Sequence, residues 1–429
     1  MTAYTVNPGD SISFAPGPAG PMGPQGPQGV PGPAGNSASV PMICGPTPDA
    51  TGSGAANLAA LTAFYDAVSK GSAHGVLPAG DYPLSAPLTI VISGATSNFT
   101  IEGAGKGATN IIAPAGPYVM GLPGGRMWRG ARFKGFSLVA GSKANLYASP
   151  VISPAGLSVS DCSWSAASFE DVEVANVGIA FNFLGGGGAD GEQAQLVRCN
   201  ATNCDTFLLI ENGQSYATQI IGGGIGARVG ATVFKIATKS GGGGVVISGF
   251  DASPYIQDQT KPSNILMFST GQSNSPITVV GGRWENVTHW AIGESGVGIG
   301  GQAVIVNAYG LDMTTDFAPG FPGLRYPAWV TLGVNDNGGN VCEFSFDGCT
   351  IAGGRIAGAQ LTFDTATLNA RNGRLRIRGG NLGYAATCPP LVTDKYFGYA
   401  TYIAKTTAAL MRAAAVKIDT NFNGLPYVQ

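Results

Sequence analysis

The chain has 429 residues, of which 67 are glycine, and only 11% of its residues are charged, with a formal net charge of −2. An apolar content of 44% excludes intrinsic disorder, and the slightly negative net charge argues against nucleic acid as a partner, because phosphate binding needs a basic surface. No apolar run reaches the roughly 18 residues that a membrane span needs, so we expect no membrane insertion. Seven scattered cysteines and two histidines predict reduced thiols, no metal site and no cofactor.

The N-terminal part contains a strict glycine period. Residues 17–35 form six unbroken Gly-X-Y triplets followed by Gly35. Only glycine fits at the axis of a collagen triple helix, so this period predicts a collagen-like triple-helical stalk and a homotrimer; a flexible Pro/Gly linker is the alternative. Residues 1–16, with alternating apolar side chains, predict a small strand-forming head, and residues 36–54 a linker.

The remainder predicts one long solenoid and a terminal segment. Apolar residues at helical spacing predict a helix over residues 57–70 at the start of a domain spanning residues 55–392. From about residue 130, short apolar runs end in Gly, Asn or Asp and recur every 23 to 38 residues or so, which is typical of a solenoid. We therefore predict an all-β fold, a right-handed parallel β-helix. Residues 393–429 break the rhythm and predict a C-terminal cap or trimerisation segment with a helix over 402–418.

Four segments near the start of this domain carry a family resemblance. They are Asp49–Gly52, the helix Asn57–Lys70, the strand Val76–Tyr82 and the segment Ile101–Gly105 with Thr109 and Ile111. Together they resemble the beginning of the pectate-lyase-like β-helices of phage tailspikes and tail fibres. An acidic D-G-x-x-D-D motif often found before the helix is reduced here to residues 49–54.

The resemblance implies a homotrimeric virion protein of the phage tail, assembled in the host cytoplasm. Such a protein would dock through its N-terminus to the baseplate or to another tail protein. It would recognise bacterial surface polysaccharide during host adhesion, and many of its relatives also cleave that polysaccharide.

Three acids are candidates for glycan cleavage. This reaction commonly needs two carboxylates, about 5 Å apart for retention of configuration or about 6.5–9.5 Å for inversion, and neighbouring coils lie roughly 4.8 Å apart. Asp251, Glu285 and Asp312 each follow an apolar residue after a turn, so we predict that they stack along one edge as catalytic acids. The alternative is that they are solvated corner residues, or that the register differs by one residue.

Other side chains are candidates for glycan binding. Trp284 and Trp290 flank Glu285 and could stack on sugar rings, with His289 nearby as an acid or base. Arg376 is the centre of an alternating arginine stripe, which predicts contact with acidic sugars or a neighbouring subunit, or simply a solvated face. Because the motifs of polygalacturonases and pectate lyases are missing, a receptor-binding fibre is favoured over a polysaccharide depolymerase, which stays the alternative.

Overall fold

The structure is a computed structural model. It describes residues 41–50, 54–91, 98–123, 128–142, 153–160, 164–184, 191–210, 217–228, 231–236, 244–254, 265–270, 277–285, 287–289, 291–293, 304–310, 312–315, 330–331, 342–353, 361–363, 373–378, 381–384, 392–394 and 417–419. The chain forms two compact units, residues 1–39 and 40–429, and all described residues belong to the second. The predicted head and stalk lie outside the described residues, as does the helix predicted over 402–418 except for its last two residues, which belong to a strand.

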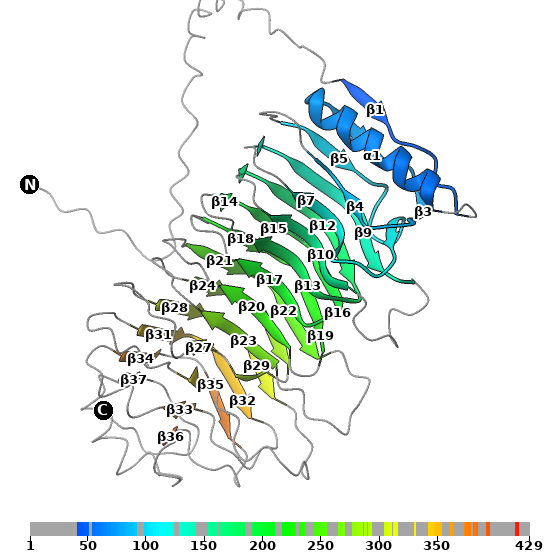
Figure 1. Cartoon of the computed structure of the whole chain (residues 1–429). Coiled ribbons are helices and arrows are strands. Elements are labelled where there is room, and N and C mark those ends of the chain that lie inside the picture. Colours follow the sequence, from blue (N-terminus) through cyan, green and yellow to red (C-terminus); the bar gives the residue numbers. More distant parts are fainter. Residues whose placement is uncertain are drawn as a thin grey trace, which may run out of the picture. The chain divides into compact units, whose positions relative to one another are not determined.

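The second unit begins with a short strand and a helix. β1 (Met42–Cys44) precedes α1 (Ala55–Lys70), and the predicted helix is confirmed with two more residues at its start. Leu61 and Val68 are fully buried on its inner face, where α1 contacts the first strands of the stack (Figure 1). Asn57 lies inside the helix, and its side-chain amide donates to the carbonyls of Asp49 at 2.8 Å and Pro83 at 3.0 Å. This amide therefore joins the helix to the first coil.

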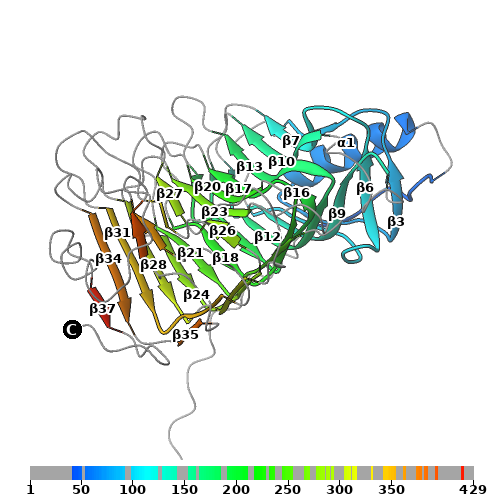
Figure 2. The same ribbon diagram turned by 90° about the horizontal axis from the view of Figure 1, so that it is seen from below.

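The strands after α1 form parallel ladders, which confirms an all-β, solenoid-like fold (Figures 1 and 2). The largest sheet contains two ladders, because β9 (Arg132–Ala140) and β12 (Ser168–Ala175) bend and take part in both. The other strands of its first ladder are β1, β2 (His74–Val76), β5 (Thr100–Glu102), β15 (Gln195–Val197), β18 (Gln219–Ile221), β21 (Val245–Ser248), β24 (Ile277–Val280), β28 (Val304–Tyr309), β31 (Cys342–Asp347), β34 (Gly373–Arg378) and β37 (Lys417–Asp419). The other strands of its second ladder are β3 (Gly80–Pro83), β6 (Thr109–Ala113), β16 (Asn200–Cys204), β19 (Gly224–Ala227), β22 (Asp251–Pro254), β25 (Arg283–Glu285), β29 (Asp312–Thr315), β32 (Thr350–Gly353) and β35 (Asn381–Tyr384).

The remaining strands complete the coils. A further sheet contains β4 (Leu88–Thr89), β7 (Tyr118–Pro123), β10 (Ser153–Ser160), β13 (Val177–Leu184), β17 (Thr206–Ile210), β20 (Thr232–Ile236), β23 (Ile265–Thr270), β26 (Val287–His289), β27 (Ala291–Gly293) and β30 (Val330–Thr331). Short pairings link β8 (Trp128–Arg129), β11 (Trp164–Ser165) and β14 (Gly191–Glu192), and also β33 (Leu361–Phe363) with β36 (Val392–Asp394).

Three rows of residues run across the first ladder, each in register from coil to coil. The core row contains Ile101, Phe133, Phe169, Leu196, Ile220, Ile247 and Val279, all at most 1% exposed. The rings of Phe133 and Phe169 stack with centroids 5.3 Å apart. We call the row one residue before the core row, which includes Arg132, row A, and the row one residue after it, which includes Lys134, row B. Because side chains alternate along a strand, rows A and B lie on the opposite face from the core row.

Left-handed backbone marks the corners of the coils. The corner after row B is occupied by Gly135, Asp171, Arg198, Gly222, Gly249, Gly281, Gly310 and Gly348, all with positive φ. The predicted turns are therefore confirmed, and glycine dominates because a Cβ makes this conformation costly. At the two adjacent corners without glycine, Arg198 donates to Asp171 through two nitrogens, at 2.6 and 2.9 Å. The bidentate ion pair offsets part of the backbone cost there.

Within the described ranges, no helix is long and apolar enough to cross a membrane.

Candidate functional site

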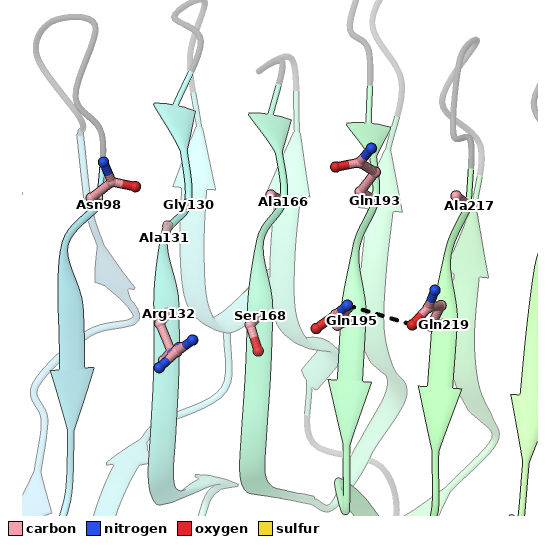
Figure 3. A pocket seen from close by; sticks show the side chains of 10 residues that line it. All are labelled: Asn98, Gly130, Ala131, Arg132, Ala166, Ser168, Gln193, Gln195, Ala217 and Gln219. Atoms are coloured by element: carbon pink, nitrogen blue, oxygen red, sulfur yellow. Dashed lines mark hydrogen bonds between the residues drawn. The ribbon is translucent and has the colours of Figure 1, made fainter. Parts of the chain in front are cut away.

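An open groove of about 470 Å³ runs across five neighbouring coils beside the first ladder (Figure 3). Its lining is rich in amides and small side chains. The lining residues are Asn98, Gly130, Ala131, Arg132, Ala166, Ser168, Gln193, Gln195, Ala217 and Gln219.

One side of the groove is a column of corner residues that precede the first ladder. Asn98, Gly130, Ala166, Gln193 and Ala217 all have left-handed backbone, with φ between 56° and 62°. A Cβ on Gly130 would lie 2.3 Å from the side-chain oxygen of Asn98, so glycine lets that amide lie over the corner. Corners that turn the same way in each coil bring their side chains to one edge.

The other side of the groove is row A. Arg132, Ser168, Gln195 and Gln219 are consecutive members of this row, in register on β9, β12, β15 and β18. Buried neighbours such as Ala131 hold the backbone against the core, so the row A side chains face the groove. Corresponding atoms on adjacent strands recur roughly every 4.8 Å.

The groove has little net charge. Arg132 is its one charged lining residue, and its Nε lies 3.5 Å from a carboxylate oxygen of Glu170. Ser168 donates to the same carboxylate oxygen at 3.1 Å. Gln195 donates to the side-chain oxygen of Gln219 at 3.4 Å, as Figure 3 shows. Each amide has donors and an acceptor, so this single bond leaves hydrogen-bonding capacity on both glutamines.

Row B, beside the groove, is a compensated charge ladder in the same coils. Glu102, Lys134 and Glu170 are in register on consecutive strands. Lys134 donates to Glu102 at 2.9 Å, and His74 Nε2 lies 3.0 Å from the other oxygen of Glu102. The hydrogen bond from Lys134 is the main reason why the pKa of Glu102 lies below its usual value. Positive and negative groups therefore alternate and leave little net field.

No family model matches this chain, and no curated protein matches it. Among solved structures, the catalytic unit of a thermostable GH87 α-1,3-glucanase from Streptomyces thermodiastaticus strain HF3-3 is similar over 92% of this chain and 70% of that chain. The identity is 12% and the TM-score is 0.36. The parallel pairing of strands from coil to coil is that of a parallel β-solenoid.

The predicted column of three acids is corrected by the strand register. Asp251 is in register with Arg283, and Arg283 with Asp312, whereas Glu285 is in register with Thr314. The prediction was anchored on the apolar residue before each acid. In the strand register, each residue of this column instead stands two positions after the left-handed glycine of its coil. In the coil of Arg283, a second glycine, Gly282, stands where the other two coils have an apolar residue. A cation thus occupies the place predicted for Glu285.

The predicted exposure of Trp284 is also corrected. Its side chain is 0% exposed, and its ring lies 5.5 Å from that of Phe250, within the core. It takes an inward position because it is in register with Ala252, which is fully buried. Trp284 therefore packs in the solenoid and has no surface for a sugar ring.

The other predicted binding residues fall in different places. His289 ends β26, in register with Leu266 of the further sheet, and Trp290 lies outside the described residues. Arg376 is in register with Ser345 and Lys417, so it belongs to row A, several coils beyond the groove. The groove glutamines were missed, although a signal existed: row A residues stand three positions before the left-handed corner, as Gln219 does before Gly222.

Proposed function

We propose that this chain is a phage tail fibre or tailspike protein that binds a bacterial surface polysaccharide in the groove of Figure 3. The observation that carries the proposal is the row of amide and hydroxyl side chains that successive coils present to one groove. Sugar hydroxyls both donate and accept hydrogen bonds, as amides do. A groove that repeats its polar groups roughly every 4.8 Å suits a repeating polymer lying along the stack of coils.

The charge of the groove favours an uncharged stretch of glycan. Glu170 already pairs with Arg132, and Ser168 hydrogen-bonds the same carboxylate, so an acidic sugar would compete with an existing ion pair. Hydrogen bonds from Gln195 and Gln219 would each contribute about 0.5–1.5 kcal/mol. Several copies of such a weak site on one particle would supply strong attachment through multivalency.

The assembly that we propose is a homotrimer. The six Gly-X-Y triplets of residues 17–35 support a collagen-like stalk, and the resemblance of residues 49–112 supports a right-handed parallel β-helix of the tailspike type. In this proposal residues 1–16 anchor the protein to the phage baseplate or another tail protein. The protein would then be part of the virion, assembled in the host cytoplasm.

Binding of the full chain to an array of purified bacterial capsular polysaccharides and lipopolysaccharides tests the proposal. We expect binding to at least one glycan, and we expect the double variant Gln195→Ala, Gln219→Ala to bind it about 5- to 150-fold more weakly. Thr278→Ala is the matched control, because Thr278 lies in the same row A outside the groove. Equal binding by the double variant and the control would show that the groove is not the binding site.

A depolymerase is the second candidate, and one observation favours it. Asp251 and Asp312 are in register two coils apart, which is roughly 10 Å along the stack and close to the upper end of the inverting range of about 6.5–9.5 Å. New reducing ends or unsaturated sugars after incubation with a bound glycan would show cleavage. Loss of cleavage but not of binding in Asp251→Asn would then assign the site, with Glu285→Gln as the comparison.

A further inference from the structure

Exposed apolar side chains gather on one part of the first ladder. Ile221, Val280 and Tyr309 belong to row B and are 44%, 42% and 40% exposed. Ser248 lies between Ile221 and Val280 in the same row. Val246, in the adjacent row A, is 40% exposed. We call these five residues of β18, β21, β24 and β28 the apolar stripe.

The same row has a different character nearer α1. There it consists of Glu102, Lys134 and Glu170, whose charges are paired. Half-buried Val197 separates this part from Ile221. The row therefore changes from compensated charge to apolar side chains partway along the ladder, and it returns to charge at Asp347, in register with Tyr309.

Isolated exposed valines on strands need no special explanation, because β-branched residues favour strands and single exposed apolar residues are common. The stripe differs because its members are in register on consecutive strands. Neighbours roughly 4.8 Å apart form one continuous surface. The polar residues in row A beside it, Gln219 and Thr278, are uncharged. Depletion of charge around aromatic and aliphatic side chains is typical of the centre of a protein interface.

We propose that the apolar stripe is the surface through which three copies of this chain pack against one another. The inference rests on the trimer of the proposed function, and it adds the face of the solenoid that the copies share. A triple helix over residues 17–35 would tether three solenoids in one particle. Tethering raises the effective concentration of one copy near another to the millimolar range. A narrow stripe is then sufficient for association.

The chemistry of the stripe suits contact between identical copies. Contacts around a threefold axis generally pair two different patches of each copy, and only residues next to the axis meet their own copies. A narrow stripe that lies along the axis therefore meets its own copies there. Apolar groups can do this at no electrostatic cost, whereas a row of like charges would repel its own copies. Tyr309 adds an aromatic ring with a polar hydroxyl, a combination that is enriched at interfaces.

Thiol labelling of the full chain tests the proposal. Ser248→Cys places a thiol in the stripe, and Thr100→Cys is the matched control in row A of the charged region, half-buried in the single chain as Ser248 is. Both carry Cys44→Ser, because Cys44 is exposed. We expect a maleimide to label position 248 at least tenfold more slowly than position 100 in the native protein, and both equally fast in urea. Mass mapping identifies the labelled position.

Light scattering on the same samples gives the number of chains. Slow labelling with a three-chain mass supports the proposal. Fast labelling at that mass places the interface elsewhere, and a one-chain mass overturns the proposal at any labelling rate. Val280→Lys should lower the melting temperature of the trimer by several degrees more than Thr100→Lys, and equal shifts would also contradict the proposal. Glycan binding by the single-chain form would separate failure of the trimer from failure of the proposed binding function.

Discussion

Two adjacent glycines at one corner allow a sharp test of how the coils are spaced. Gly222 and Gly223 connect β18 to β19, with φ of 63° and 81°. A Cβ on Gly222 would lie 3.7 Å from the side chain of Arg198, an ordinary contact. A Cβ on Gly223 would lie 2.0 Å from the carbonyl oxygen of Cys199 in the preceding coil. The two alanine substitutions therefore share a backbone cost and differ in a clash.

The expected magnitudes follow from this difference. Gly222→Ala should cost about 1 kcal/mol of unfolding free energy, since left-handed backbone costs about 1–2 kcal/mol and the stiffer unfolded chain returns about 0.4–1 kcal/mol. Gly223→Ala must also displace the Cys199 carbonyl, which accepts a hydrogen bond from the Gly224 N–H at 3.0 Å. Because Cys199 is buried, leaving its carbonyl without that hydrogen bond adds about 1–3 kcal/mol.

Urea denaturation of the full chain, followed by circular dichroism, measures both changes. We expect the midpoint of Gly223→Ala to fall clearly below that of Gly222→Ala, with limited proteolysis cutting first near this corner. Equal midpoints for the two variants would refute the reasoning, because they would show that the coils can separate here without loss. Gly249→Ala is a further control, since a Cβ there meets nothing within 4 Å.

Three more predictions concern the groove, the charge ladder and the thiols. Gln219→Ala should weaken glycan binding about 2- to 12-fold. Added salt should change the affinity of the native protein by less than about twofold, because the proposed ligand is uncharged. A steep fall in affinity between low and high salt, measured by calorimetry, would contradict this expectation. The pKa of Glu102 is lowered in the folded protein, so its pair with Lys134 stabilises the fold at pH values above the unfolded pKa of Glu102. This stabilisation is lost as the pH falls through the folded pKa. Lys134→Met should therefore reduce the acid-induced loss of unfolding free energy, measured by urea denaturation, by no more than about 1 kcal/mol. Burial raises the pKa of Cys199 to about 12, so iodoacetamide at pH 8 should modify exposed Cys44 and spare Cys199 until urea is added.

The coil rhythm could be predicted because folding imposes it on particular residues. Phe133, Phe169 and Ile220 must be apolar to face the core, and glycines such as Gly135 and Gly222 suit the left-handed corner. These demands recur in every coil, so they leave a period in the sequence. The helix α1 could be predicted for the same reason: one of its faces covers the first coil, so apolar residues recur on that face at helical spacing.

The candidate site was harder to predict, because folding does not require a particular residue type at its positions. Gln195 and Gln219 stand next to each other only through the register of coils that differ in length. The predicted acid column shows the difficulty: an alignment on apolar residues moved Glu285 into a place that Arg283 occupies. An alignment on the left-handed glycines would have placed both correctly.

Row A also bears on how such a protein can change its ligand. The residues that hold a coil together are its neighbours in the core row and at the corners, so a new side chain at Gln195 or Gln219 leaves folding almost untouched. Specificity and stability can therefore diverge independently under selection. Duplication of a coil would lengthen the groove by one strand spacing, roughly 4.8 Å, and leave its shape intact. If the groove binds glycan as we propose, the length of glycan that it contacts would be set by the number of coils, which evolution can change in whole steps.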